Sequence, residues 1–344
     1  MKLIDTTDAV GHVLCHDITR IIPGREKGPV FRKGHIVTEE DIPVLLSVGK
    51  EHLYVWEKND DMLHEDEAAY ILRDICTGGS DDMTSSEPSE GKIEIRAAVD
   101  GLLRIDTEKL MKINLEGDMM IASVKGNVPV RKGDPICATR VIPLVISKEK
   151  MERAKRIAGD EAVFRILPFR DFSYGIITTG SEVAKGLIKD SFGPVLKAKA
   201  DEFGGRFMRQ AILSDDMEKI TEEILKMAEE GAGLIMVSGG MSVDPDDRTP
   251  GAIKATGADI VTYGVPVLPG AMFLLSYLDH GGKKIPVLGI PGCAMYKKRT
   301  VLDLVLPRII AGEILTAEDI ASYGEGGLCM SCDVCTFPHC RFGT

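Results

Sequence analysis

Three segments of the chain combine glycines with hydroxyl side chains in an order that could bind a phosphate. They are residues 178–182 (TTGSE), 238–249 (beginning SGGMS) and 289–293 (GIPGC). Glycine lets a backbone approach a ligand closely, and amide groups at the start of a helix can hold an anion. One such segment is usually only a turn, whereas three at one sheet edge favour an anion pocket. The candidate binding residues are Thr178, Thr179, Gly180, Ser181, Ser238, Gly239, Gly240, Met241, Ser242, Pro291 and Gly292.

Three aspartates in the second segment add negative charge to this group. Asp244, Asp246 and Asp247 would repel a phosphate unless a Mg²⁺ ion lay between them. We therefore expect a metal-bridged phosphate ligand, with Asp244 and Asp247 as the metal ligands. The candidate catalytic carboxylates are Asp247, Asp244 and Glu182. The competing interpretation is that at least one aspartate only caps the helix that begins at Thr249.

Four of the eight cysteines fall within twelve residues: Cys329, Cys332, Cys335 and Cys340. In a reducing compartment such a cluster indicates a metal before disulfides. Thiolates at three-residue spacing can wrap one corner of an iron-sulfur cube, although four thiolates would also satisfy structural Zn²⁺. An iron-sulfur cluster, Zn²⁺ and a metal-free redox or disordered tail all stay open. Cys293, in the third glycine segment, is either a reactive thiol or a small buried residue.

Binding loops need a sheet to align them, and the sequence from residue 174 onward predicts one. Strands are predicted over 174–178, 207–213, 234–237, 260–263 and 285–290, and helices over 194–203, 215–230, 249–255, 272–278 and 300–310. Asp215, with Glu218 three residues later, predicts the start of the second helix. Strands that alternate with helices indicate an α/β fold with a parallel sheet, which binds ligands beyond the carboxyl ends of its strands.

The rest of the chain divides by composition. We expect an N-terminal α+β segment over residues 1–76, a flexible linker over 77–91, which lacks apolar periodicity, and a small β-rich domain over 92–148. A connecting helix over 149–171 then leads into the domain of residues 172–315, and a cysteine-rich tail takes residues 316–344. The length of 344 residues suits two or three domains.

The charge of the chain argues against two classes of partner. Forty-two Lys and Arg against 53 Asp and Glu give a net charge of −11. The chain lacks the dense basic block that binding to nucleic acid or an anionic membrane needs. Its early Asp5 and its lack of a long apolar run argue against a secretion signal and a membrane span. We expect a cytoplasmic protein that binds neither nucleic acid nor membrane.

The glycine segments together resemble the molybdopterin-binding domain shared by molybdopterin molybdenumtransferase, the gephyrin E domain and molybdopterin adenylyltransferase. Residues 178–182, 238–243 with Asp247, and 289–292 carry this resemblance, which covers residues 172–315. Residues 247–250 (DRTP) match the adenylyltransferase branch. The other matches to that branch are Gly186, Asp190 and Gly193.

This resemblance implies a three-layer α/β/α molybdopterin-binding domain with a parallel-rich sheet, preceded by smaller β-rich domains and often dimeric. It implies molybdopterin, or its adenylylated form, on the glycine-rich loops, with Asp247 in catalysis or Mg²⁺ binding. Molybdate, a molybdoenzyme and a second copy of the chain are the further partners that it suggests.

The chain departs from the transferase pattern where an oxyanion would bind. Residues 268–272 read LPGAM where the transferases have Lys-Pro-Gly-Lys-Pro, so both ammonium groups are missing. Ser181 and Cys293-Ala294 stand where the transferases have Asp and Asn-Pro. Three functions therefore stay open: a molybdenum-inserting transferase, a non-catalytic molybdopterin carrier or insertion chaperone, and an adenylyltransferase.

Overall fold

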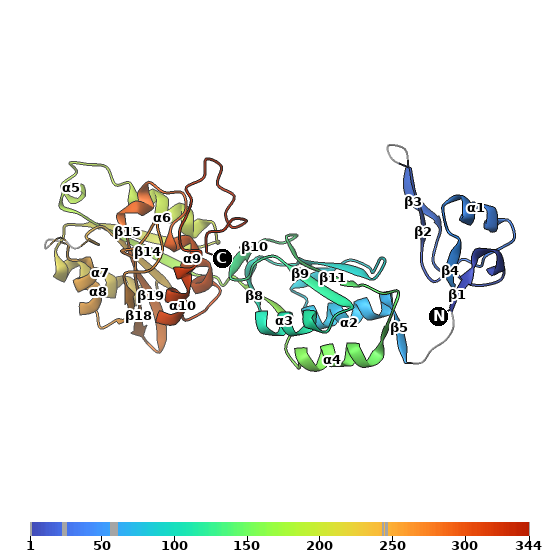
Figure 1. The fold of residues 1–344 in the computed structure, drawn as a ribbon. Coiled ribbons are helices and arrows are strands. Elements are labelled where there is room, and N and C mark those ends of the chain that lie inside the picture. Colours follow the sequence, from blue (N-terminus) through green and yellow to red (C-terminus); the bar gives the residue numbers. More distant parts are fainter. Residues whose placement is uncertain (1, 23–25, 56–60, 243, 245–246, 344) are drawn as a thin grey trace. The chain divides into compact units, whose positions relative to one another are not determined.

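The structure is a computed structural model that describes residues 2–22, 26–55, 61–242, 244 and 247–343. The chain divides into two compact units, which Figure 1 colours along the sequence. Unit 1 comprises Met1–Val99, Ile105–Val124 and Arg131–Arg165, and unit 2 comprises Asp100–Arg104, Lys125–Val130 and Ile166–Thr344. Within the described ranges, no helix has both the length and the apolar character needed to cross a membrane.

The first part of unit 1 consists of two antiparallel strand pairs and a short helix around a small core. Strand β1 pairs with β4, and β2 pairs with β3. The core residues are Ala9, Leu14, Ile18, Val37, Leu45 and Leu53. The elements are β1 (Lys2–Asp5), η1 (Thr6–Asp8), β2 (Ile18–Ile22), β3 (Glu26–Phe31), α1 (Asp41–Ser47) and β4 (His52–Val55).

The second part of unit 1 is a four-stranded antiparallel sheet with helices. Helix α2 begins with a capping box between His64 and Glu67 and ends at Gly78, whose φ is 58°. It packs on β7 and β11, so it belongs with this sheet rather than with the predicted 1–76 segment. The elements are β5 (Met62–His64), α2 (Glu65–Thr77), β6 (Met83–Ser85), β7 (Lys92–Ala97), α3 (Thr107–Leu115), β9 (Met119–Ser123), β11 (Pro135–Val141), β12 (Val145–Ser147) and α4 (Lys148–Ala158).

The stretch predicted as a flexible linker, residues 77–91, is instead an edge of this sheet. Strand β6 pairs antiparallel with β7, and the backbone amide of Gly91 donates to Asp66 Oδ1 at 3.1 Å. The prediction was wrong because a three-residue edge strand pairs its backbone while burying only Met83, which leaves no apolar periodicity. The predicted connecting helix over 149–171 is likewise shorter: it is α4, followed by strand β13 (Phe164–Pro168).

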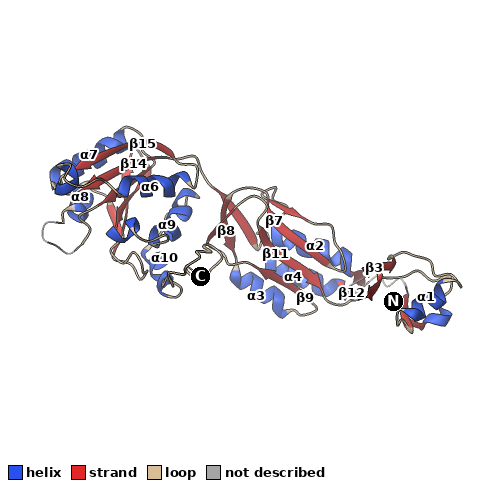
Figure 2. Ribbon diagram, turned by 90° about the horizontal axis from the view of Figure 1, so that it is seen from above, coloured by secondary structure: helices blue, strands red, loops and turns tan. Residues whose placement is uncertain are grey.

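Unit 2 contains a six-stranded sheet in the order β15-β14-β16-β19-β18-β17. The first four strands are parallel, whereas β18 and β17 are antiparallel to their neighbours. Helices α6 and α9 pack into the core on one face, and α7 and α8 pack on the other. Figure 2 shows these helices in blue around the red strands. Every residue of β14 is buried, as a strand covered on both faces requires.

The expected three-layer domain with a parallel-rich sheet is therefore confirmed, as are the smaller β-rich parts before it. The elements of the domain are β14 (Ser173–Thr179), α5 (Ser181–Ala184), α6 (Phe192–Asp201), β15 (Arg206–Leu213), α7 (Met217–Glu229), β16 (Leu234–Ser238), α8 (Thr249–Ala255), β17 (Asp259–Tyr263), β18 (Leu274–His280), β19 (Lys283–Ile290), η2 (Gly292–Met295), α9 (Val301–Ile310), α10 (Ala317–Ala321) and η3 (Ser322–Gly324).

One predicted element has the wrong type: residues 272–278 form most of strand β18 and not a helix. The run from Leu274 to Leu278 is buried throughout because β18 lies between β17 and β19. A short apolar run fits a buried strand and a buried helix equally well, so periodicity could not separate them.

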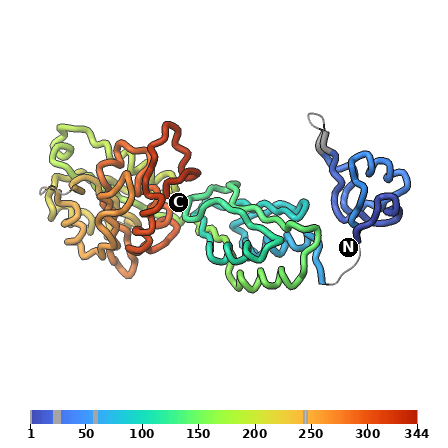
Figure 3. Tube along the Cα trace, viewed as in Figure 1, coloured from blue at the N-terminus to red at the C-terminus, as the bar shows by residue number. Residues whose placement is uncertain are grey.

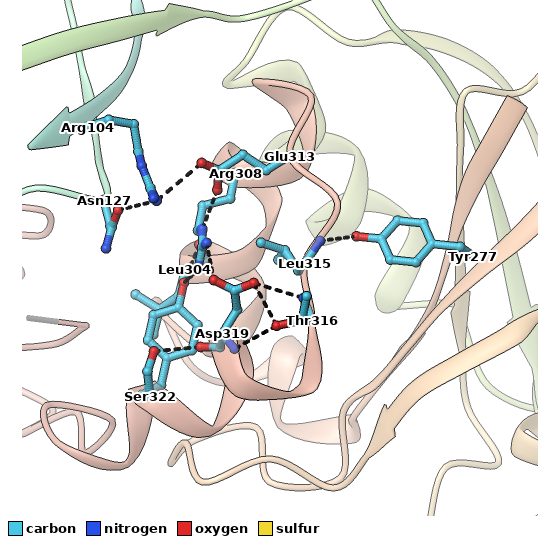
Figure 4. Close-up of polar contacts among 11 residues, drawn as sticks. Arg104, Asn127, Tyr277, Leu304, Arg308, Glu313, Leu315, Thr316, Asp319 and Ser322 are labelled. Carbon is cyan, nitrogen blue, oxygen red and sulfur yellow. Dashed lines mark hydrogen bonds and ion pairs between the residues drawn. The ribbon is translucent and has the colours of Figure 1, made fainter. Parts of the chain in front are cut away.

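A hairpin from the middle of the sequence also belongs to unit 2. Strands β8 (Gly101–Ile105) and β10 (Val128–Val130) pair antiparallel. Arg104 donates to Glu313 at 3.2 Å, and Glu313 also accepts a hydrogen bond from Arg308 Nε at 2.6 Å (Figure 4). Arg308 is buried and donates further to Asp319 at 2.7 Å. This paired network fixes the hairpin to the end of α9, because a buried guanidinium must keep its carboxylate partners.

Candidate functional site

A cavity of about 490 Å³ lies at the carboxyl ends of β16 and β19. We call it the strand-end cavity. It brings together the second glycine segment, the third glycine segment and the residues that replace the basic stretch of the transferases. Its lining residues are Gly239, Gly240, Met241, Ser242, Asp247, Leu268, Pro269, Gly270, Ala271, Met272, Pro291, Gly292 and Cys293.

The first glycine segment touches the second but does not line this cavity. Gly239 has a φ of 90°, and a Cβ placed there would lie 2.2 Å from the carbonyl oxygen of Thr179. Thr249 Oγ1 donates to the Gly239 carbonyl at 2.7 Å and lies 3.3 Å from Thr179 Oγ1. The two backbones are thus in direct contact, which only a glycine at position 239 permits.

Three hydroxyl side chains among the candidate binding residues face the protein interior. Thr178 and Ser238 are fully buried and Thr179 is 3% exposed. Thr178 Oγ1 accepts a hydrogen bond from Gln210 Nε2 at 2.9 Å, and the same nitrogen donates to Asp190 at 2.6 Å. These threonines therefore hold the end of β14 in place, and a ligand in the strand-end cavity would not meet them directly.

Asp215 supplies a contact that the sequence did not reveal. Its Oδ2 accepts from the backbone amide of Ser181 at 3.0 Å, so a carboxylate already occupies the amide at the start of α5. The prediction that Asp215 caps the following helix is wrong: Asp216 is the cap and accepts from the amide of Lys219 at 3.3 Å. The available signal was the position of Asp215 just after β15, at the same sheet edge. Glu182 is exposed on α5 and does not line the strand-end cavity.

Asp247 is the candidate carboxylate that reaches the strand-end cavity. Its Oδ2 accepts from the backbone amide of Ser242 at 2.6 Å, which folds the second segment back on itself. Its own amide donates to the carbonyl of Asp244, an exposed residue that does not line the cavity. Helix α8 has Arg248 at its N-cap and no side-chain cap, so neither of these two aspartates plays that role. Asp246 lies outside the described residues.

The strand-end cavity has no cationic wall in the part that the structure describes. Among its described lining residues Asp247 is charged, and none is Lys, Arg or His. The Tyr263 hydroxyl donates to the Met241 carbonyl at 3.0 Å, and burial followed by the charge of Asp247 raises the pKa of Tyr263. Burial also raises the pKa of the Cys293 thiol, which Lys297 partly opposes. Cys293 is therefore mainly a neutral thiol at neutral pH.

The cysteine-rich tail forms a second pocket in unit 2, of about 540 Å³. We call it the cysteine pocket. Its lining residues are Tyr296, Lys297, Lys298, Arg299, Leu328, Cys329, Met330, Ser331, Cys332, Cys335, Thr336, Phe337, Cys340, Arg341 and Phe342. Within the described ranges, no three His, Cys, Asp or Glu side chains are close enough to hold one metal ion.

The tail is folded against the domain, as the dark red trace in Figure 3 shows. Phe342 is only 4% exposed and joins the core that α6 and α9 cover. The Leu268 amide donates to the Gly327 carbonyl, and the Cys329 amide donates to the Leu268 carbonyl, both at 2.8 Å. Leu268 lines the strand-end cavity and Cys329 lines the cysteine pocket, so these hydrogen bonds link the walls of the two pockets.

Two family models match the chain. Residues 175–311 match a family described as a probable molybdopterin binding domain. Residues 3–57 match a family described as a domain of unknown function (DUF8806). The first match contains all three glycine segments and Asp247.

Several known proteins are similar to parts or most of the chain. A protein of Staphylococcus epidermidis (strain RP62A) named molybdopterin molybdenumtransferase is 24% identical over 337 residues, which cover 91% of this chain and 74% of the relative. A CinA-like protein of Mycobacterium leprae is 36% identical over 75 residues, or 22% of this chain and 18% of the relative. The solved tungsten cofactor synthesizing protein MoaB of Pyrococcus furiosus is 18% identical, with a TM-score of 0.34, and covers 41% of this chain and 92% of its own.

Proposed function

We propose that the strand-end cavity binds molybdopterin or adenylylated molybdopterin, because residues 175–311 match a family described as a probable molybdopterin binding domain. The observation that carries this proposal is the lining itself: close-packed glycine backbone on two strand ends with Asp247 beside it. Backbone amides at such strand ends suit a phosphate, and the apolar wall of Leu268, Pro269 and Met272 suits a flat pterin ring.

A divalent cation fits this lining. An anionic phosphate beside Asp247 meets a like charge, and the described lining offers no ammonium or guanidinium group to offset it. Mg²⁺ prefers one or two carboxylates together with substrate phosphates. Asp247, with Asp244 next to it in the loop, would hold the ion, which supplies charge neutralisation at the phosphate. The Ser242 amide fixes the Asp247 carboxylate for this role.

The activity we propose is insertion of molybdenum from molybdate into the dithiolene of the bound pterin. The chain orients the pterin through the second and third glycine segments and excludes water with the apolar wall at residues 268–272. Molybdate is a substrate here and not a resident cofactor. The 24% identical molybdopterin molybdenumtransferase aligns over 91% of the chain, beyond residues 172–315, and so supports this activity for the chain as a whole.

A second candidate function is a carrier that holds molybdopterin for a molybdoenzyme without inserting metal. The specific observation in its favour is the uncharged segment Leu268–Met272 in the cavity wall, where a transferase would need cations for molybdate. The third alternative, adenylylation of molybdopterin with ATP, is supported by the DRTP sequence at 247–250. We also propose a cytoplasmic homodimer, which sedimentation of the purified chain would test.

One experiment separates these functions. The full chain is incubated anaerobically with molybdopterin, molybdate, ATP and Mg²⁺, and retained pterin, inserted molybdenum and consumed ATP are measured. Insertion that is lost in Asp247→Asn and kept in Asp259→Asn, an exposed aspartate of β17, supports the transferase. Pterin retained without insertion supports the carrier, and pterin-dependent ATP consumption supports the adenylyltransferase. No pterin retained at all would overturn the proposed function.

A further inference from the structure

The tail brings its four cysteines to one pocket, and this pocket carries an inference that the pterin site does not explain. Cys329, Cys332, Cys335 and Cys340 are all free thiols, and all four line the cysteine pocket. Cys332 and Cys335 are exposed, whereas Cys329 and Cys340 pack against the core. Two of the thiols are therefore accessible to reagents from solution, while the other two are held in place by the core.

The local fold explains how the fourth cysteine joins the other three. The first three follow one another at three-residue spacing, and four residues separate Cys335 from Cys340. The chain turns in this interval, where the amide of His339 donates to the carbonyl of Thr336 at 2.7 Å. Phe337 packs on the Arg299 guanidinium at 4.9 Å from its ring centre, which holds the turn against the domain. Cys340 thereby faces the same pocket as the others.

The spacing of the thiols argues against a single metal ion. A zinc ion binds four sulfurs at about 2.3 Å, which draws them to within about 4 Å of one another. In the described part of the chain, no three potential ligands are placed so that they could hold one metal ion, and the four cysteines line a cavity of about 540 Å³. An iron-sulfur cube presents a separate iron to each thiolate, so it fits ligands that stay apart.

The charge around the cysteine pocket suits an anionic metal-thiolate site. Four thiolates around a cluster leave it with a net negative charge. Lys297, Lys298, Arg299 and Arg341 line the pocket, and its described lining contains no Asp or Glu. Arg299 is already paired with Asp303 at 2.8 Å and with Glu202 at 3.3 Å, so Lys297 and Lys298 are the side chains that offset the charge of a cluster. Leu328, Met330 and Phe342 add apolar surface, which limits the access of water to a cluster. The described lining of the strand-end cavity has one thiol, Cys293, and no Lys, Arg or His for such a group.

We propose that the cysteine pocket binds one [4Fe–4S] cluster through Cys329, Cys332, Cys335 and Cys340. Each thiol loses its proton to solvent as its sulfur binds one iron. Two ferrous ions, two ferric ions and four sulfide ions from solution together give a core of charge 2+, so assembly needs no further oxidant.

The test is anaerobic reconstitution of the full chain with equal amounts of ferrous and ferric iron and with sulfide, followed by measurement of bound iron, acid-labile sulfide and visible absorption. We expect about four irons and four sulfides per chain, and a spin signal after reduction with dithionite. Each of the variants Cys332→Ser and Cys335→Ser should bind at least about tenfold less iron than the unmodified chain. Because both positions are exposed, neither change should unfold the chain, which circular dichroism checks. The matched control is Cys293→Ser, outside the pocket, which should keep the full iron content.

Other outcomes would overturn the cluster. Tight binding of one Zn²⁺ that excludes iron would assign the pocket to structural zinc, and iron content unchanged in Cys332→Ser would place the iron elsewhere. Two disulfides in the anaerobically purified chain would make the tail a redox element. None of these readouts uses molybdopterin, so a failure here is distinct from a failure of the proposed pterin site.

Discussion

The strand-end cavity and the cysteine pocket are similar in size and are linked by the hydrogen bonds between Leu268 and the tail, yet their linings have opposite character. The strand-end cavity is lined by glycines, apolar side chains and Asp247. The cysteine pocket is lined by four thiols, Lys297, Lys298, Arg299 and Arg341. The described lining of the first pocket therefore contains no Lys, Arg or His, whereas four cationic side chains line the second pocket.

This difference teaches that the two pockets suit different ligands. We propose that a phosphate in the strand-end cavity is held by a divalent cation and backbone amides, since no lysine offsets Asp247 within the described lining. A negatively charged metal cluster in the cysteine pocket needs no added cation, because the wall provides positive side chains. A change in one pocket should leave the other pocket unaffected, so the second pocket serves as the control for the first.

The largest effect is expected from Gly239→Ala, which should remove the strand-end cavity. The new Cβ would lie 2.2 Å from the Thr179 carbonyl oxygen, at a φ of 90°. Backbone strain and overpacking together should destabilise the domain by about 2–5 kcal/mol. Hydrogen exchange of the β14 and β16 amides would measure the loss, and pterin binding should disappear.

Gly292→Ala is the matched control for this change. It alters a glycine of the same cavity, but a Cβ there meets nothing within 4 Å and φ is not in the left-handed region. Its exchange rates should match the unmodified chain. Equal stability of the two variants would show that the contact between the first and second segments is not needed.

An intermediate effect is expected in the alkylation of Cys293. Burial raises the pKa of this thiol above its ordinary value, so the reactive thiolate is scarce at neutral pH and alkylation should accelerate as the pH rises beyond 9. Molybdopterin with Mg²⁺ at about ten times its Kd should slow the reaction about tenfold. Peptide-resolved mass spectrometry with iodoacetamide separates Cys293 from the tail.

The tail cysteines should show the opposite pattern of protection from alkylation. Reconstitution with iron and sulfide should protect Cys332 and Cys335 and leave Cys293 reactive. Protection of Cys332 and Cys335 by molybdopterin alone would show that the two pockets form one site. It would contradict the proposal that they bind different ligands.

The smallest effect is expected from Phe337→Leu in the cysteine pocket. The change removes the ring under the Arg299 guanidinium but keeps an apolar side chain. Loss of the cation-π contact should cost about 0.5–1 kcal/mol, a two- to fivefold rise in the open fraction of the tail. Limited proteolysis between residues 328 and 343 would detect it, whereas Phe337→Tyr retains the ring and should be cleaved at the original rate. Faster cleavage of both variants would show that the ring face is not the relevant contact.

Most of the domain was predictable because its strands and helices have strong local signals. Helix α8 begins and ends at the predicted residues, and β14, β15, β16 and β19 differ from the prediction by a few residues at their ends. The exception, β18, is a buried apolar run whose partners are β17 and β19, and pairing between distant segments leaves no mark in a local pattern.

The candidate site was less predictable because it depends on which loop ends meet. The sequence placed Asp247 and the glycine segments at one sheet edge, but it could not show that Thr178 and Thr179 turn inward to Gln210 and Thr249. It also could not tell Asp215 from Asp216 as the helix cap, since both precede the same apolar face. Gathering the four cysteines with Lys297 and its neighbours required the tail to fold back, which composition does not encode.

The paired backbone hydrogen bonds of Leu268 have a thermodynamic consequence. Leu268 holds the tail through Gly327 and Cys329, and the same residue forms part of the wall against which a pterin would lie. If loading of the cysteine pocket restrains this segment, it alters the affinity of the neighbouring cavity by some factor. Linkage then requires that occupation of the cavity alter the affinity of the cysteine pocket by the same factor. Through this single residue in β-bridge pairing, a ligand bound in one pocket would change the affinity of the other pocket for its own ligand.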